Sequence, residues 1–245
     1  MKSDRTARIT GLFYLGLAAS GLILFLLVTP QLYVSGDGAA TAANLVQHEG
    51  LARFGIAAEL VLVVAAALAS VWFFRLFRAV DSFAAGCLAA FGLVNAVIMM
   101  VGAVFTATAL QVALEPGQGF GAIDPGATVG LLYQLHGAAW SVGALFFGLW
   151  LIPMGWLVLR SGSMPRPLGW ILIGGGIGYV FVAFVAQLAP GATTVADLDL
   201  LSLPASIGEF WLIGYLLLVG VRRNPTPGAH VRHSPSAPTV EARDR

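Results

Sequence analysis

The stretch VGLLYQLHGAAWSVGALFFGLWLIPMGWLV, residues 129–158, decides the fold of this chain. It contains no aspartate, glutamate, lysine or arginine, and it exceeds the roughly 20 apolar residues that a helix needs to cross a membrane. The period-two alternation that would indicate barrel strands is absent. The stretch therefore predicts a membrane-spanning helix, within which the histidine, His136, needs a polar partner.

The rest of the chain follows the same pattern. It is 58% hydrophobic and only 10% charged, whereas soluble domains carry about 25% charged residues. We expect an all-α fold, a single integral membrane bundle of six helices covering residues 1–222. The predicted spans are 9–31, 52–74, 83–112, 129–158, 168–189 and 203–221. Residues 223–245 are rich in proline and predict a disordered cytoplasmic tail.

The arginines predict the orientation of the spans. Basic residues precede the first span and follow the second, fourth and sixth, while Arg53 is alone among the outer loops. By the positive-inside rule, both termini are expected to be cytoplasmic in a multi-pass protein of the cell (cytoplasmic) membrane. The single lysine against twelve arginines is typical of a GC-rich bacterial gene.

Composition also limits the partners. A net charge of +1 and the lack of a basic-aromatic face argue against nucleic-acid binding. One cysteine, Cys87, excludes an intrachain disulfide. The bilayer is the expected partner, and the sequence predicts no metal and no cofactor, because no ligand spacing is specific for one.

A short helix is expected in the loop that follows the first span. Residues 39–50, AATAANLVQHEG, have a helical composition, and Gly50 is predicted to stop the helix. This helix is expected to lie on the outer surface.

Three ionisable residues fall inside predicted spans: Glu59, His136 and Glu209. Each lies about seven residues after the start of a span that runs inward, roughly 10 Å below the outer boundary at 1.5 Å per residue. We therefore expect them to share one depth and to face a pocket that opens outward. The other expected members of this pocket are Gln187, Tyr133 and Ser206, and Tyr133 lies on the same helix face as His136 and Trp140.

Two interpretations of this polar layer stay open. The groups could satisfy one another between helices and only fix the packing. Alternatively, a Glu–His pair could exchange a proton or bind a small molecule or lipid. An intramembrane enzyme that uses the same groups for acid-base or metal chemistry, or a non-catalytic membrane helper or sensor, are the remaining alternatives. Nothing in the spacing predicts an enzyme.

Arg160 and Arg166 flank the turn between the fourth and fifth spans. Their side chains could bind lipid phosphates, although charges at this place also set the topology.

Four segments resemble a known family in their order along the chain: RITGLFYL (8–15), ATAANLVQHEGLARFGIAAEL (40–60), GLWLIPMGWLVLRSGSMPRPLGWILIGGGIGY (148–179) and IGEFWLIGYLLLVGVR (207–222). Together they resemble the bacterial multi-pass membrane family catalogued as domain of unknown function 4386. The run from Pro153 to Gly169 is the most specific part. The resemblance implies a membrane-embedded architecture and implies no activity or site residues.

Overall fold

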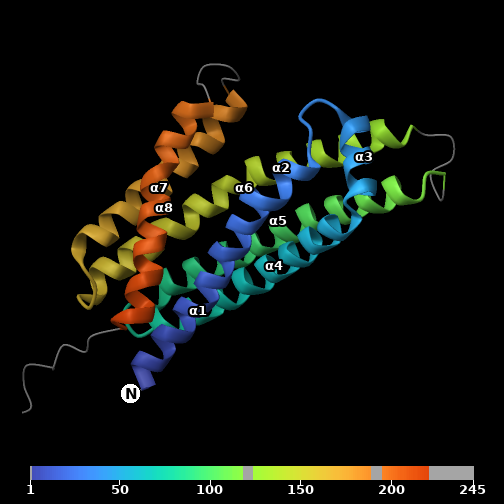
Figure 1. Cartoon of the computed structure of the whole chain (residues 1–245). Coiled ribbons are helices and arrows are strands. Elements are labelled where there is room, and N and C mark those ends of the chain that lie inside the picture. The colour runs from blue at the N-terminus through green and yellow to red at the C-terminus, as the bar shows by residue number, and fades with distance from the viewer. Residues whose placement is uncertain (1, 118–123, 189–194, 221–245) are drawn as a thin grey trace, which may run out of the picture.

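The computed structural model describes residues 2–117, 124–188 and 195–220, and for residues 2, 3 and 195–202 the backbone alone. The described residues form helices joined by short turns and contain no strand, so the all-α prediction is confirmed (Figure 1). The elements are α1 (Lys2–Ile23), the π-helix η1 (Leu24–Val28), α2 (Thr29–Leu32), α3 (Gly38–Gln47), α4 (Glu49–Phe77), α5 (Ser82–Leu114), α6 (Pro125–Ser161), α7 (Arg166–Leu188) and α8 (Val195–Leu218).

Five of these helices are long and apolar enough to cross a membrane. They are Asp4–Leu32, which joins α1, η1 and α2, and then Glu49–Phe77, Ser82–Leu114, Pro125–Ser161 and Arg166–Leu188. They coincide with the first five predicted spans and indicate a membrane protein. The apolar part of α8 that the structure describes, Leu203–Leu218, falls short of the spanning length. The predicted tail, 223–245, lies outside the described residues.

Capping residues explain where several helices begin and end. The Asp81 carboxylate accepts a hydrogen bond from the backbone N–H of Ala84 at 3.1 Å and starts α5. Asp124, followed by Pro125, caps α6 in the same way. At the other end of α6, Gly162 has a φ of 61°, a left-handed conformation that glycine adopts without steric cost.

The short helix in the first loop is present as α3, but its predicted end is wrong. The helix ends at Gln47, and Gly50 lies within the first turn of α4. His48 separates the two helices with φ −114° and ψ 42°. Because this turn needs no positive φ, no glycine is needed to stop the helix.

The long helices form a closed ring. The first helix, α1, packs against both α4 and α8, and the ring continues through α4–α5, α5–α6, α6–α7 and α7–α8 (Figure 1). The short α3 covers α5 and α6 at one end of the ring.

Small residues bring the backbones of α6, α7 and α8 close together. A Cβ added at Gly176 of α7 would lie 2.8 Å from the carbonyl oxygen of Gly148 on α6. A Cβ at Gly175 would lie 2.5 Å from the backbone of Ala205 on α8. Since no side chain fits at these contacts, glycine is required for the observed packing.

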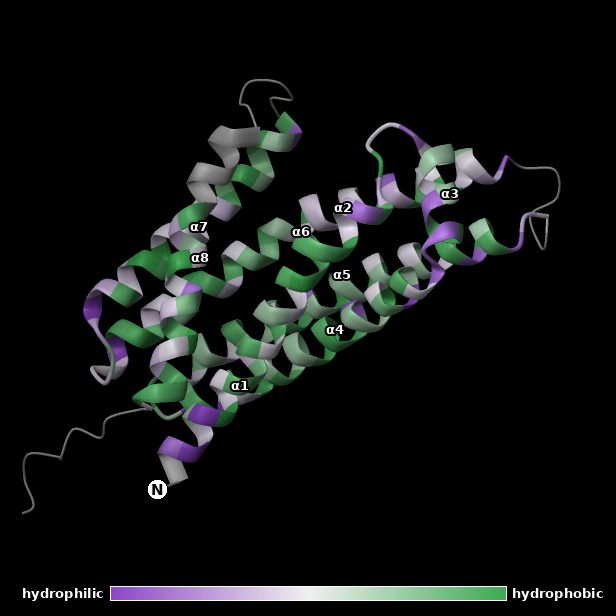
Figure 2. Ribbon diagram, in the orientation of Figure 1, coloured by the Kyte–Doolittle hydropathy of each residue, from purple (hydrophilic) through white to green (hydrophobic). Residues whose placement is uncertain are grey.

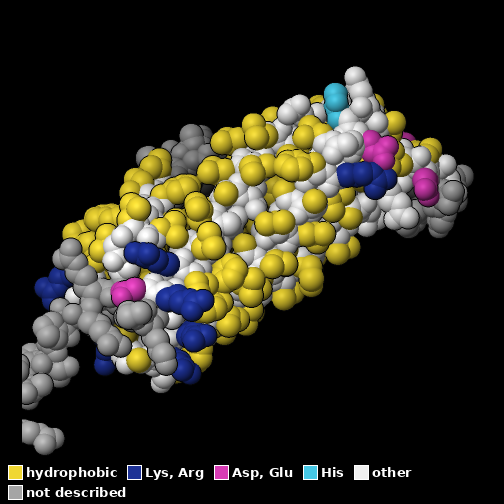
Figure 3. Space-filling view, turned by 60° about the horizontal axis from the view of Figure 1, so that its bottom comes forward, with side chains coloured by type: hydrophobic (Ala, Val, Ile, Leu, Met, Phe, Trp, Pro, Cys, Tyr) yellow, Lys and Arg dark blue, Asp and Glu magenta, His cyan; other side chains and the backbone are white. Residues whose placement is uncertain are grey.

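Charged side chains gather at the two ends of the bundle, and an apolar belt lies between them (Figures 2 and 3). We call one end the basic end, with Arg5, Arg8, Arg75, Arg78, Arg160 and Arg166. The opposite end, the acidic end, carries Asp37, Glu49, Glu115 and Asp124. This separation is the charge pattern on which the predicted orientation depends.

Candidate functional site

A cavity of about 700 Å³ lies inside the ring of helices. It reaches from Tyr33 and Leu45, near the acidic end, to Tyr14 and Ile213 deeper in the bundle. The first span, α4, α5, α6, α7 and α8 all contribute to its wall, and most lining side chains are apolar. Pockets of this size are typical of sites that bind small molecules.

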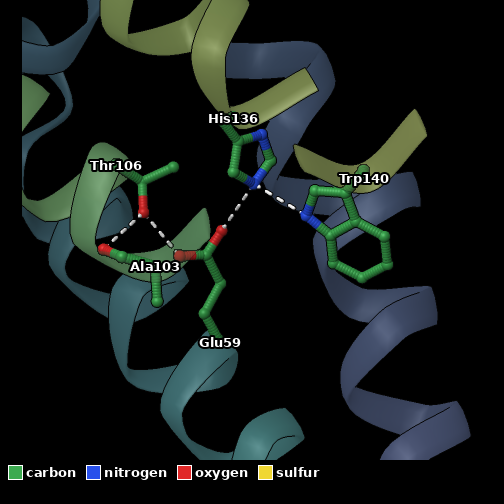
Figure 4. A network of polar contacts seen from close by, with 5 residues as sticks. All are labelled: Glu59, Ala103, Thr106, His136 and Trp140. Atoms are coloured by element: carbon green, nitrogen blue, oxygen red, sulfur yellow. Dashed lines mark hydrogen bonds and ion pairs between the residues drawn. The ribbon is translucent and has the colours of Figure 1, made fainter. Parts of the chain in front are cut away.

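Two of the predicted residues meet in the wall of this cavity. Oε1 of Glu59 on α4 lies 3.3 Å from Nε2 of His136 on α6 (Figure 4). The other oxygen of Glu59 accepts a hydrogen bond of 2.5 Å from the hydroxyl of Thr106 on α5. The indole Nε1–H of Trp140, one turn after His136, donates to the same Nε2 at 3.0 Å. We call Glu59, Thr106, His136 and Trp140 the polar cluster.

The hydrogen bonds around Nε2 of His136 leave one donor missing. A ring nitrogen carries either a hydrogen or a lone pair, so it cannot both donate to Glu59 and accept from Trp140. When Nε2 accepts from Trp140, it presents no hydrogen to the carboxylate oxygen 3.3 Å away. A proton or an external donor is then needed between the two acceptors, because unpaired polar atoms in an apolar interior are costly.

Glu209 also lines the cavity, but it belongs to a second polar pair. Its carboxylate accepts a hydrogen bond of 2.5 Å from the hydroxyl of Tyr14. The ring of Tyr14 packs against Trp150, with centroids 5.4 Å apart, and Trp150 follows His136 by about 20 Å of helix. The prediction that Glu59, His136 and Glu209 share one depth is therefore wrong.

The reason for this error lies at the start of α8. The helix begins at Val195, well before the predicted boundary at residue 203. Because depth was counted from that boundary, Glu209 was placed about two turns too close to the outer surface.

The remaining predicted pocket residues divide into two groups. Tyr133 lines the cavity, stacks on Tyr33 with centroids 5.2 Å apart, and lies next to the His136 ring. Ser206 lines the cavity and is exposed. Gln187 is exposed near the C-terminal end of α7 and does not belong to the described lining.

The two arginines proposed to bind lipid phosphates differ in their surroundings. Arg160 lies 3.2 Å from the carboxylate of Asp81, and its guanidinium is 5.9 Å from the Trp156 ring centroid. Arg166 is exposed at the first residue of α7. The backbone N–H of Ala84 and the charge of Arg160 lower the pKa of Asp81 below its ordinary value of 3.8.

Sequence reasoning missed two members of these polar pairs, Thr106 and Tyr14. Threonine in a helix commonly bonds its own backbone, and Thr106 indeed also lies 3.1 Å from the carbonyl oxygen of Ala103 (Figure 4). Tyr14 looks like an apolar span residue in the sequence. Only the contact with Glu209, 195 residues away, shows its polar role.

The polar groups of the cavity do not form a recognisable metal site. Among the described residues, no group of three or more histidine, cysteine, aspartate and glutamate side chains could hold a metal ion.

Comparison with known proteins identifies a family. No curated protein and no solved structure matches the chain. The profile of the family described as "Domain of unknown function (DUF4386)" matches residues 9–220, which is most of the sequence. This match confirms the family suggested by the four sequence segments. The chain therefore belongs to the domain of unknown function 4386 family.

Proposed function

We propose that this protein is a six-span protein of the cytoplasmic membrane that binds a small amphipathic molecule in the cavity between its helices. Both termini lie on the cytoplasmic side in this proposal. The polar cluster recognises the polar part of the ligand, and the apolar wall takes the rest.

The arrangement of α8 supports the sixth span. The helix is 24 residues long, which at 1.5 Å per residue gives about 36 Å, enough to cross a bilayer core. It packs against α1 and α7, and thereby closes the ring of long helices. The arginines of the basic end support a cytoplasmic location for that end.

The binding proposal rests on the donor that is missing at Oε1 of Glu59. Glu59 is buried, and its carboxylate faces a histidine nitrogen that already accepts from Trp140. Glu59 and His136 both line a cavity that is large enough for a ligand. A ligand that brings a hydrogen-bond donor would complete the cluster.

Binding fits the structure better than transport does. Toward the basic end, the cavity meets a closely packed aromatic group in which Tyr14, Phe73 and Trp150 are each almost completely buried. Their rings pack with centroids 5.3–6.1 Å apart. A transport path would need polar, hydrated surroundings at this point.

Two glycine substitutions test the proposal with the same chemical change. Gly137 lines the cavity and is exposed, and a Cβ added there meets open space. Gly137→Leu should therefore fill part of the cavity without disturbing the helices. Gly174→Leu is the matched control, because Gly174 is also exposed, faces open space and lies outside the described lining.

The measurement is native mass spectrometry of the protein released from phosphatidylcholine nanodiscs that contain dodecan-1-ol. We expect one bound dodecan-1-ol on the wild type and on Gly174→Leu, and none on Gly137→Leu. Equal binding to all three proteins would reject the proposed function, and so would a wild type that binds no amphiphile of this size, whatever its head group.

A further inference from the structure

The cavity is open on one side of the bundle, where several of its lining residues are exposed. Its exposed lining residues belong mainly to the first span and to α8. Phe25 and Leu26 of η1 are 79% and 64% exposed, and Phe210 of α8 is 49% exposed, although all three also line the cavity. Figure 1 shows α8 next to α1 near the basic end and leaning away from η1 and α2 toward the other end. We call this opening between η1 and α8 the side opening.

The sequence explains why the helix is irregular at the side opening. Pro30 lies just after η1, and in a regular α-helix its ring would collide with the carbonyl oxygen four residues earlier. The π-helix widens the turn, and the backbone N–H of Thr29 bonds to the carbonyl of Leu24. Single π-helical turns in otherwise α-helical segments are frequent at functional sites.

Charge in the cavity selects the kind of polar group that it can hold. The lining contains two carboxylates, Glu59 and Glu209, and one histidine, and it contains neither lysine nor arginine among the described residues. A phosphate or carboxylate would meet no fixed positive charge there. A positively charged group would meet a buried carboxylate, and charge-assisted hydrogen bonds of this kind are the strong ones.

Aromatic rings complete the surroundings of Glu59. Tyr33, Tyr133 and Trp140 line the same part of the cavity, with Tyr33 and Tyr133 stacked and Trp140 next to His136. Such ring faces attract ammonium groups through cation–π interactions. An ammonium N–H directed at Oε1 of Glu59 would also supply the donor that the polar cluster lacks.

From these observations we propose that the ligand is a single-chain amphiphile with an ammonium head. It comes from the bilayer through the side opening, its ammonium binds Glu59 within the aromatic rings, and its chain lies against the apolar wall. The proposal rests on the proposed function and names the ligand class for the same cavity.

The test compares three probes with the same chain and different heads: dodecylamine, dodecan-1-ol and dodecyl phosphate. Each is titrated into the full-length protein in phosphatidylcholine nanodiscs, and bound probe is counted by native mass spectrometry. We expect dodecylamine to bind about tenfold more tightly than dodecan-1-ol, and dodecyl phosphate to bind least.

A conservative variant tests whether Glu59 binds the head group of the probe. Glu59→Gln keeps the shape and removes the charge, so the preference for dodecylamine over dodecan-1-ol should disappear. Glu49→Gln, which changes a half-exposed carboxylate that pairs with Arg53 at the acidic end, should keep the preference. The comparison of heads on the wild type decides the proposal even if Glu59→Gln fails to fold.

The results that would contradict the ammonium proposal differ from those that would contradict the binding function. If dodecan-1-ol or dodecyl phosphate binds as tightly as dodecylamine, or if Glu59→Gln binds with an unchanged preference, the ammonium proposal is wrong and the binding function stands. If no probe binds the wild type, both proposals are wrong.

Discussion

The half of the bundle toward the basic end is tightly packed, whereas the other half contains a cavity. In the half toward the basic end, glycines bring α6, α7 and α8 into backbone contact, and aromatic rings from α1, α4 and α6 fill the centre. In the other half, the same helices enclose a cavity of about 700 Å³. Its lining is mostly apolar and contains a few polar side chains. Since the contacts of the packed half hold these helices together, the cavity of the other half leaves room for the ligand that we propose.

This difference follows from the physics of packing in a membrane. Lipid is as apolar as the side chains, so helices associate through close contact rather than through the hydrophobic effect. Close contact of α7 on both sides, at Gly175 and Gly176, supplies that attraction. Ionisable residues within membrane spans are costly and mark functional sites, so the burial of Glu59 is consistent with a role in binding.

The largest expected effect comes from filling the packed half. Gly176→Leu places a side chain where a Cβ alone would lie 2.8 Å from a carbonyl oxygen of α6. Overpacking costs about 1–3 kcal/mol and occasionally more, and we expect a value at the upper end because backbone must move. Thermal unfolding in detergent measures the change. Gly174→Leu, on the same helix and facing open space, should unfold close to the wild-type temperature.

If both leucine variants unfold at the wild-type temperature, the contrast between a tightly packed half and a hollow half is wrong.

An intermediate effect is expected where the two halves meet. Tyr14→Phe removes the donor to Glu209 and leaves its carboxylate without that bond. The loss should destabilise the protein by about 1–3 kcal/mol. A double-mutant cycle with Glu209→Leu isolates the interaction, because Tyr14→Phe should cost clearly less once the carboxylate is gone. Additive effects would show that the two side chains are not coupled.

The smallest effect is expected at the basic end, outside the spans. Asp81 caps α5 and pairs with Arg160. Because its pKa in the folded protein is lowered, its stabilisation is present above the ordinary value of 3.8 and is lost as the pH falls below that value. Asp81→Ala should therefore lower the unfolding temperature slightly at pH 7 and by a smaller amount at pH 3. An equal decrease at both values would contradict this assignment.

The sequence predicted the helices well because each long apolar segment has one stable structure in a membrane. Counting depth along α4 and α6 from charged loops also predicted that Glu59 and His136 share one level, and the structure places their side chains 3.3 Å apart. Counting failed for Glu209, because α8 starts within a loop-like sequence that contains Asp197 and Asp199. The predicted helix end at Gly50 is wrong because His48, two residues earlier, already ends the helix.

Other features of the site arise only from tertiary structure. Thr106 and Tyr14 are polar partners that no local pattern reveals, and the side opening depends on the angle between α8 and the first span. The π-helix is a partial exception, since Pro30 inside an apolar helix indicates an irregularity although not its type.

The most direct test of the central claim is an electron cryomicroscopy structure of the protein in phosphatidylcholine nanodiscs with dodecylamine. We predict elongated density that runs from the bilayer between η1 and α8 and ends at the Glu59 carboxylate. A map in which η1 packs against α8 and the cavity is filled by side chains would contradict the account.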